Sequence, residues 1–489
     1  MSVLILRIIE KLLIIYFGLY ILFDIGMYVY ALFFFLTRKK KLKPGDAKFD
    51  KVSVVIPAYN EEVSIEACLR AMTRMNYPDY EIIVVNDGST DKTLEVLHNI
   101  LRLEPAPVKT SNASVPTKKI KQVWKDAHLP VIVVDKINGG KADAINAGIN
   151  LSEGKYICTV DADSILSPDA LLNAVKPFIK NPETIVSGGQ LAVLNGLQIR
   201  NNKTENTGLP KNPLVQWQII EYIKSFLISR LAFSKINALL IMSGAFSVFK
   251  KKDLMEIGGF LNPENRHPVI TSYLGPNKST VCEDMEIVVR LWRYARDNKR
   301  KVKTAFVPEA VCWTEVPESP RNLFKQRSRW HQGLGETLWL HKTMLFDPRY
   351  GTTGLIAMPY YLLFEFVSPL IKIFALVFLA VALTNDLVHT RWLLLMIASI
   401  MLLTALIMSS VTVVIEYANA RNTTGKDALR YKNFSGWMKL MLYGIVSEFS
   451  YAFFRILAQM DGMVKWIKGY KNWNKFQRKG IVIIKETES

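Results

Sequence analysis

A chain of 489 residues is long enough for two or three domain-sized units. Half of the residues are apolar, but both ends carry long hydrophobic runs, whereas residues 44–350 have the composition of a soluble α/β domain. The formal net charge of +19 would suit a nucleic-acid partner, yet many Lys and Arg residues flank the hydrophobic runs. That placement favours a membrane with anionic lipids and argues against nucleic acid. The four cysteines are far apart and form no CxxC pair, which argues against a disulfide scaffold or a zinc site.

Residues 1–43 are predicted to be a retained membrane anchor. The apolar run 12–36 has the length that a bilayer requires, is interrupted only by Asp24, and lacks a small-residue cleavage site. Arg38, three lysines and Lys43 follow it directly. The positive-inside rule then places the next domain in the cytoplasm, so we expect a multi-pass protein of the plasma (inner) membrane.

Residues 44–350 are predicted to form one α/β domain around a parallel sheet, because apolar strands alternate with helical patterns. The predicted strands are 52–56, 80–85, 131–135 and 156–160, with further strands at 185–194 and 239–249 and a helix over about 214–235 between those two. The lysine- and proline-rich segment 104–128 is expected to be an inserted surface loop.

Carboxylates follow two of these strands at the edge where open α/β sheets bind ligands. Asp161 and Asp163 stand just past the strand 156–160 and suit Mg²⁺ or Mn²⁺ with positions left for phosphate oxygens. Asp87 ends its strand in the same way and can accept a hydrogen bond from a ribose or uracil donor. The alternative at all three positions is an ordinary Asx turn.

Two glycine-containing segments are candidates for close approach of a ligand to the backbone. Lys141 follows two glycines and supplies a point charge for a diphosphate, in a loop that is not a Walker A motif. Ser243 and Gly244 interrupt the strand 239–249 with small residues, as expected where a ligand approaches the backbone. No GxGxxG motif supports a dinucleotide cofactor.

Two helices carry further candidates. Glu283 and Asp284 open a helix of about fifteen residues, where they either act as acid–base groups or merely complement the helix dipole. Gln326, Arg329 and Trp330 share one face of the helix predicted over 322–340. That face can offer donors to a phosphate and an aromatic plane to a sugar, or it can rest on lipid headgroups.

Three hydrophobic segments, 355–383, 392–416 and 437–459, make residues 351–464 a region of transmembrane and interfacial helices. Lysines alternate with aromatic residues in 465–489, which is typical of a basic amphipathic helix on a membrane surface. Three crossings after the anchor would place this basic tail outside, against the charge rule, so we expect that one segment does not cross.

The order of Asp87, Asp161-Ala-Asp163, Glu283-Asp284 and Gln326-Arg-Ser-Arg329-Trp330 resembles the "D, DxD, ED, QxxRW" set of processive family 2 glycosyltransferases. This family includes cellulose, hyaluronan, chitin-oligosaccharide and poly-N-acetylglucosamine synthases. The resemblance covers about residues 52–330. It implies a GT-A (Rossmann-like) cytosolic domain with flanking transmembrane and interfacial helices, and a UDP-linked sugar donor.

The resemblance also implies roles for the candidate residues. Asp87 would contact the uridine, Lys141 the diphosphate, Asp161 the nucleotide and Asp163 the metal. Asp284, beside Glu283, would be the general base. Gln326, Arg329 and Trp330 would hold the diphosphate and the acceptor end, and Ser243 and Gly244 would line the acceptor.

The expected activity is inverting, metal-dependent transfer of a sugar from a UDP-sugar to a growing β-linked polysaccharide, with export of the polymer through the protein's own helices. N-acetylglucosamine is favoured over glucose on general resemblance. Two alternatives stay open, namely transfer of one sugar to a lipid acceptor and an inactive membrane transporter or scaffold. The sequence does not reveal accessory proteins or the oligomeric state.

Overall fold

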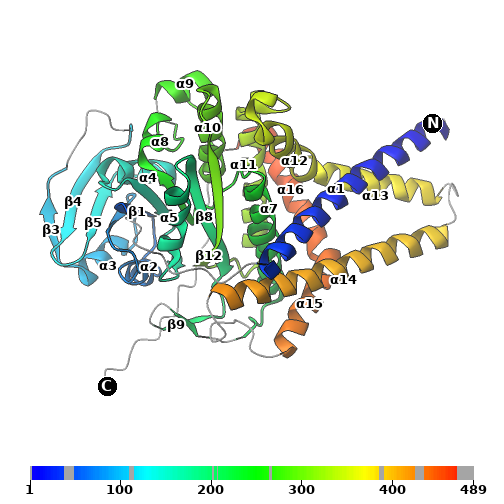
Figure 1. The fold of residues 1–489 in the computed structure, drawn as a ribbon, viewed down its shortest axis with the longest axis horizontal. Coiled ribbons are helices and arrows are strands. Elements are labelled where there is room, and N and C mark those ends of the chain that lie inside the picture. The colour runs from blue at the N-terminus through cyan, green and yellow to red at the C-terminus, as the bar shows by residue number, and fades with distance from the viewer. Residues whose placement is uncertain are drawn as a thin grey trace.

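The computed structural model describes residues 3–37, 49–108, 115–200, 203–205, 208–263, 267–384, 390–423 and 434–470. The four predicted parallel strands form the middle of a ten-stranded sheet with the order β3-β4-β5-β2-β1-β6-β11-β8-β12-β7 (Figure 1). Their bounds are β1 Val52–Ala58, β2 Tyr80–Asn86, β5 Val131–Lys136 and β6 Tyr156–Val160. They are buried on both faces, which is why each reads as a continuous apolar run.

The other half of the sheet mixes strand directions. The remaining strands there are β7 Ser164–Leu166, β8 Thr184–Val193, β11 Phe246–Lys250 and β12 Lys303–Thr314. Strand β11 runs antiparallel to β6 and to β8, so β8 and its parallel neighbour β12 point the same way as the four central strands. The strand predicted over 239–249 is therefore too long, because only its second half pairs. The preceding segment leaves the sheet where the Gly244 amide binds Asp284 instead.

The prediction of a surface loop over 104–128 is wrong at two places in that segment, where strands form. Strands β3 Leu103–Ala106 and β4 Ile120–Asp126 pair with each other and extend the sheet beyond β5. The sequence does not mark these strands, because their lysines and prolines are typical of loops. An edge strand such as β3 can contain proline, and a strand face that meets water can carry lysines. Positions 109–114 lie outside the described residues.

Helices connect the strands and pack against the sheet. These are α2 Ile65–Met72, α3 Thr93–Ile100, α4 Lys141–Leu151, α5 Ala170–Lys180, α8 Lys251–Glu256, α9 Pro268–Leu274 and α10 Glu283–Asp297. A short ribbon, β9 Gln198–Arg200 with β10 Lys203–Glu205, stands apart from the main sheet. The helix predicted over 214–235 is present as α6 Pro213–Tyr222, the π-helix η1 Ile223–Ser229 and α7 Arg230–Lys235.

Helix α11, Pro320–Leu340, joins the α/β domain to the apolar helices. Its first turn has Ser319 as a cap, whose side chain accepts from the Asn322 amide, and Pro320 at a position where no amide is needed. Short turns follow it, η2 Lys342–Met344, η3 Pro348–Tyr350, η4 Thr353–Ala357, α12 Met358–Tyr360 and η5 Tyr361–Phe366.

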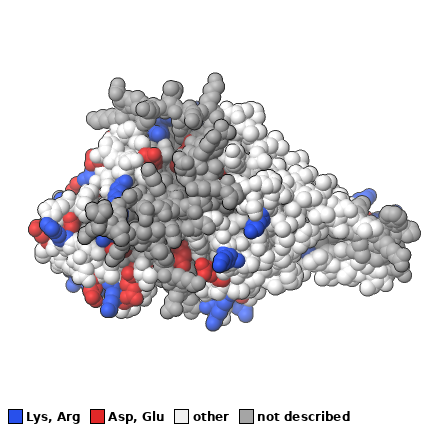
Figure 2. All heavy atoms as spheres, turned by 90° about the horizontal axis from the view of Figure 1, so that it is seen from below, with Lys and Arg blue, Asp and Glu red and all other residues white. Residues whose placement is uncertain are grey.

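Long apolar helices extend from the side of the domain opposite β3 (Figure 1). They are α1 Val3–Thr37, α13 Ser368–Thr384, α14 Thr390–Thr423, α15 Phe434–Phe449 and α16 Tyr451–Lys468. Figure 2 shows Lys, Arg, Asp and Glu scattered over the α/β domain, whereas the projecting helices present mostly uncharged side chains.

Among the described residues, two helices, Ile5–Thr37 and Ala398–Asn419, are long and apolar enough to cross a membrane. The number rises to four if each of two bent pairs is one span, Thr353–Phe366 with Ser368–Thr384 at 46° and Phe434–Phe449 with Tyr451–Lys468 at 49°. The predicted anchor and three C-terminal segments coincide with these four units. The basic run after the anchor and positions 471–489 of the predicted amphipathic tail lie outside the described residues.

Candidate active site

The ends of the parallel strands bring together side chains that are far apart in the sequence. Lys141 begins α4 directly after β5, and its ammonium Nζ lies 2.6 Å from Asp161 Oδ1, just past β6. The same Nζ lies 3.4 Å from Glu283 Oε1 at the start of α10. Three of the predicted site residues therefore form one ionic cluster at the carboxyl edge of the sheet, where α/β folds bind ligands.

Asp284 and Gly244 complete this cluster. The Gly244 amide donates to Asp284 Oδ2 at 3.0 Å, and the Met285 amide donates to Asp284 Oδ1 at 2.9 Å. A Cβ atom at Gly244 would lie 2.9 Å from Lys141 Nζ, so a larger residue at position 244 would require the lysine side chain to shift within the cluster. Ser243 is buried next to it, and its Oγ accepts from the Ala245 amide at 3.4 Å.

Burial and the neighbouring charges shift the pKa values of the ionisable groups in this cluster in opposite directions. Burial lowers the pKa of the Lys141 ammonium, but the Asp161 and Glu283 carboxylates outweigh it and hold that pKa above its ordinary value. Burial raises the pKa of Glu283 from 4.5, and Lys141 only partly offsets this rise. Lys141 therefore keeps its charge, while Glu283 takes up a proton at a higher pH than a free glutamate does.

Asp87 is held by an internal network rather than by this cluster. Its Oδ1 lies 2.6 Å from Lys136 Nζ and accepts from the Gly139 amide at 3.0 Å, and its Oδ2 accepts from the Gly140 amide at 2.8 Å. Lys136 is fully buried. The predicted contact of Asp87 with a uridine stays a prediction, and what the structure adds is that this carboxylate organises the loop before Lys141.

The predicted metal ligands fit a hard divalent cation. Asp163 is almost fully buried, and Ser164 Oγ donates to its Oδ1 at 3.2 Å, while Asp161 stands one residue earlier beside Lys141. Within the described ranges, no group of three or more His, Cys, Asp or Glu side chains could hold a metal. Two carboxylates that need phosphate oxygens and water to complete the coordination suit Mg²⁺ or Mn²⁺, which bind few protein ligands beside nucleotides.

The QxxRW residues on α11 are held mainly by another part of the molecule. The Arg327 guanidinium lies 4.2 Å from the centre of the Trp330 ring, and its nitrogens donate to Glu221 of α6 at 2.5 to 3.2 Å. Gln326 Oε1 accepts from the same guanidinium. Arg329 is close enough to Glu283 to lower the pKa of that carboxyl. The structure therefore links Arg329 to the strand-end cluster, whereas Gln326 and Trp330 belong to a cluster with α6.

Three charged residues with little or no exposed surface support the site but are absent from the sequence prediction. Lys136 follows the strand predicted over 131–135, and a lysine at the end of an apolar strand was the available signal. Arg327 lies inside the QxxRW motif, at one of its variable positions. Glu221 lies in an apolar helical segment, where a lone carboxylate implies a buried partner.

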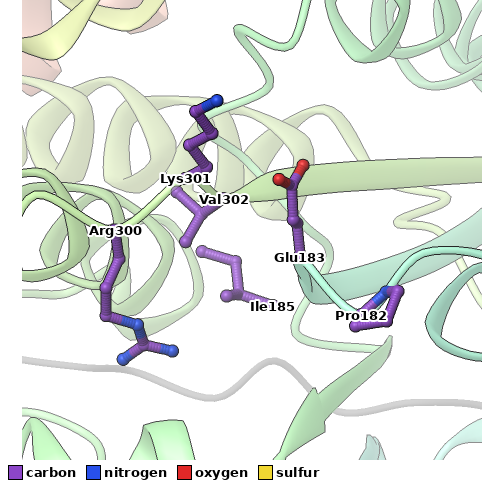
Figure 3. A pocket seen from close by; sticks show the side chains of 6 residues that line it. All are labelled: Pro182, Glu183, Ile185, Arg300, Lys301 and Val302. Carbon is purple, nitrogen blue, oxygen red and sulfur yellow. The ribbon is translucent and has the colours of Figure 1, made fainter.

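A pocket of about 350 Å³ lies at the opposite edge of the sheet, where β8 and β12 begin. Its lining comprises Pro182, Glu183, Ile185, Arg300, Lys301 and Val302 (Figure 3). None of these is a predicted site residue. Ligands of α/β sheets bind at the carboxyl ends of the strands, so this pocket does not compete with the cluster around Lys141.

A likeness to a solved structure confirms the predicted fold. A mannosyltransferase from Pyrobaculum calidifontis, solved in complex with GDP-Man and Mn²⁺, superposes with a TM-score of 0.56 and 19% sequence identity. The superposition covers 95% of this chain and 100% of the other. The protein has the mixed α/β sheet of the GT-A type, with long apolar helices flanking it.

Curated relatives point to the same family. The poly-beta-1,6-N-acetyl-D-glucosamine synthase of Staphylococcus epidermidis is 26% identical over 332 residues, which are 66% of each chain. The enzyme of the same name from Staphylococcus aureus strain COL is 25% identical over 333 residues, again 66% of each. The chain thus spans about two thirds of the length of these curated relatives.

Two family models match the sequence itself. Residues 53–258 match "Glycosyl transferase family 2", and residues 156–417, more than half of the chain, match "Glycosyl transferase family group 2". The first match includes Asp87, Lys141 and the Asp161-Ala-Asp163 motif. The second continues through Glu283-Asp284 and the QxxRW motif into the apolar helices. The chain therefore belongs to glycosyltransferase family 2, a family of sugar-transferring enzymes.

Proposed function

We propose that this protein extends a β-linked polysaccharide, with inversion at the anomeric carbon, by transferring a sugar from a UDP-sugar at the cytoplasmic face of the membrane. The observation that carries the proposal is the contact of Lys141 Nζ with both Asp161 and Glu283, with Asp284 beside them. A cation for the diphosphate and a carboxylate for the acceptor hydroxyl thus stand within one cluster.

The transfer is a single in-line displacement. Asp284 accepts the proton of the acceptor hydroxyl, whose oxygen bonds to the anomeric carbon as the bond from that carbon to the diphosphate breaks. Lys141 and Arg329 offset the negative charge that develops on the leaving UDP. Asp161 and Asp163 would hold Mg²⁺ or Mn²⁺, which adds positive charge at the same diphosphate. One displacement inverts configuration, so an α-linked donor gives a β-linked product.

Glu283 has a separate part in this scheme. Its carboxylate is the second acid beside Lys141, at 3.4 Å, and it lies next to the base in sequence. A bound diphosphate would compete with Glu283 and Asp161 for the lysine. In this scheme the charge of Glu283 holds Lys141 in place for the diphosphate, and burial raises the pKa at which that charge is lost.

The polymer and the sugar are proposed from the relatives and from the apolar helices. The curated relatives at 25 to 26% identity are named as synthases of poly-beta-1,6-N-acetyl-D-glucosamine, so N-acetylglucosamine is the proposed sugar. Charged side chains lie where α6 and η1 meet the apolar helices: Lys224 pairs with Glu448, and Arg455 lies 3.9 Å from Glu221. Such groups suit a polar path for the growing chain.

The test uses the full chain in nanodiscs with Mn²⁺ or Mg²⁺. Each common UDP-sugar and GDP-mannose is supplied singly and in pairs, and UDP or GDP release is measured together with product size. We expect UDP release from UDP-N-acetylglucosamine with a growing polymer, and none from the Asp284→Asn variant. A single-sugar lipid adduct would instead identify a non-processive transferase. Absence of nucleotide binding would identify an inactive transporter or scaffold and overturn the proposal.

A further inference from the structure

Lys136 is a buried cation between two buried carboxylates. Its side chain has no exposed surface, and Nζ lies 2.6 Å from Asp87 Oδ1 and 2.5 Å from Asp143 Oδ1. Nζ also donates to the Ile137 carbonyl at 2.6 Å. All three hydrogens of the ammonium group are therefore used inside the protein, at the end of β5. A lysine in this setting contacts no substrate and acts only through its neighbours.

The Asp87 carboxylate, which Lys136 holds in place, also binds the loop before α4. It accepts from the Gly139 and Gly140 amides, and Asn138 Nδ2 donates to the Asp87 carbonyl at 2.8 Å. Gly140 has a φ of +88°, which side chains rarely permit. The next residue is Lys141, whose ammonium contacts Asp161 and Glu283. The position of that ammonium depends on the path of this loop.

Asp143 holds the same loop from the other side. It stands in the first turn of α4, and a Cβ atom at Gly139 would lie 2.5 Å from its Cγ. Its Oδ2 also accepts from the Lys118 amide at 3.1 Å, so the part of the 104–128 segment that leads into β4 is attached here as well. The loop is thus fixed between Asp87 and Asp143, and Lys136 holds these two carboxylates together.

We propose that Lys136 is a positioning residue of the donor site, which sets the place of Lys141 for the diphosphate of a nucleotide sugar through Asp87 and the glycine loop. The proposal deepens the function proposed above and rests on it. It assigns to Asp87 a part in shaping the loop, in addition to the uridine contact that the family resemblance implies. It also gives the inserted segment a structural link to the donor site.

Three variants separate positioning from simple charge balance. Lys136→Met leaves two carboxylates facing each other in a buried site, so it reduces stability as well as donor binding. The double variant Lys136→Met/Asp143→Asn removes one charge of each sign and restores the balance. Lys136→Arg keeps the cation with a different shape. A matched control is Arg300→Met, which removes the partner of the buried Asp253 near the pocket of Figure 3, far from Lys141.

Steady-state kinetics with UDP-N-acetylglucosamine, thermal unfolding and calorimetric titration with UDP and Mn²⁺ are measured for each full-length protein in nanodiscs. We expect the double variant to unfold near the wild-type temperature, with KM for the donor and Kd for UDP raised about tenfold or more and kcat changed less. Loss of an indirect support of a ligand-binding group has effects of about this size. Lys136→Arg should recover part of the loss, and Arg300→Met should lower stability with KM unchanged.

The outcomes distinguish this proposal from the proposed function. A double variant with wild-type KM and wild-type Kd for UDP would overturn the role of Lys136 and leave the transferase intact. Raised KM in Arg300→Met equal to that in the double variant would also overturn it, since removal of any cation beside a buried carboxylate would then have the effect. Wild-type protein that binds UDP but turns over no sugar would refute the proposed function while the Kd values still test Lys136. Wild-type protein that binds no UDP overturns both.

Discussion

The two halves of the candidate site are built in different ways. On the donor side, Asp87 and Asp161 directly follow two parallel strands and Lys141 opens the helix after a third, so all three lie at the same sheet edge. On the acceptor side, Trp330 is carried by a long helix and held through Arg327 and Glu221, from helices more than a hundred residues apart. The donor half therefore depends on the sheet, and the acceptor half depends on how α11 packs.

Helix α16 adds to this dependence on packing. Ser328 Oγ donates to Asp461 at 2.5 Å and accepts from Lys465 at 2.9 Å, and Tyr451 donates to Glu221 at 2.8 Å. A Cβ atom at Gly462 would lie 2.4 Å from the Ser328 carbonyl, so the two helices touch along their backbones. Substitutions that break the contacts of α11 should therefore leave donor binding unchanged, whereas substitutions at the strand ends should weaken it.

The largest effect is expected from Asp284→Asn. Removing a general base costs about 100-fold to 10,000-fold in turnover. Asn keeps the size of Asp, and its one side-chain oxygen can still accept from the Gly244 amide, although not from the Met285 amide as well. Calorimetry should therefore give a Kd for UDP close to that of the wild type. Turnover that survives this change within a factor of two would show that another group takes the acceptor proton.

Glu221→Gln should affect only the acceptor half of the site. It leaves the nearly buried Arg327 guanidinium without its carboxylate, which costs about 3–5 kcal/mol for a buried pair. We expect a lower unfolding temperature in nanodiscs and slower polymer elongation, with the KM of the donor unchanged. Glu183→Gln, in an exposed pair with Lys303, serves as the control and should have little effect on either. A raised donor KM in Glu221→Gln would mean that the two halves are not separable.

The pH dependence of turnover probes the donor half. Burial raises the pKa of Glu283 above 4.5, so its charge beside Lys141 is lost, as the pH falls, earlier than for a free glutamate. The acidic limb of the profile of kcat/KM against pH should therefore lie above pH 4.5 and should move to lower pH in Glu283→Gln. The sign for stability follows from the same shift. A raised folded-state pKa makes the wild type lose stability relative to Glu283→Gln as the pH rises through that pKa.

The smallest effect is expected from Lys465→Ala on α16. Its pair with Asp461, at 2.6 Å, is about one third exposed on both sides, and such pairs contribute about 0 to 1 kcal/mol. Thermal unfolding should change slightly and donor KM not at all. A large loss of elongation in this variant would show that the contact with Ser328 holds the QxxRW helix more tightly than the exposure of the pair suggests.

The strands in the middle of the sheet and the candidate membrane segments could be predicted from the sequence alone. Val52–Ala58, Tyr80–Asn86 and Tyr156–Val160 are apolar runs of strand length, and the anchor is an apolar run of bilayer length, so composition alone marks them. The candidates at the strand ends were equally accessible, because a parallel sheet places the residues after its strands at one edge. The edge strand β3 and its neighbour β4 were not, since both carry exposed residues and the lysines of β4 resemble those of a loop.

The pairing of the buried charged residues could be seen only in the tertiary structure. Nothing near Lys136 in the sequence indicates that Asp87 and Asp143 close around it, and nothing near Arg327 points to Glu221. The physical reason is that local sequence specifies backbone conformation and burial, whereas a buried charge is compensated by whichever partner the packing brings within about 3 Å. Helix α11 is the clearest example, because its motif can be recognised in the sequence but its orientation is fixed by packing against α6 and α16.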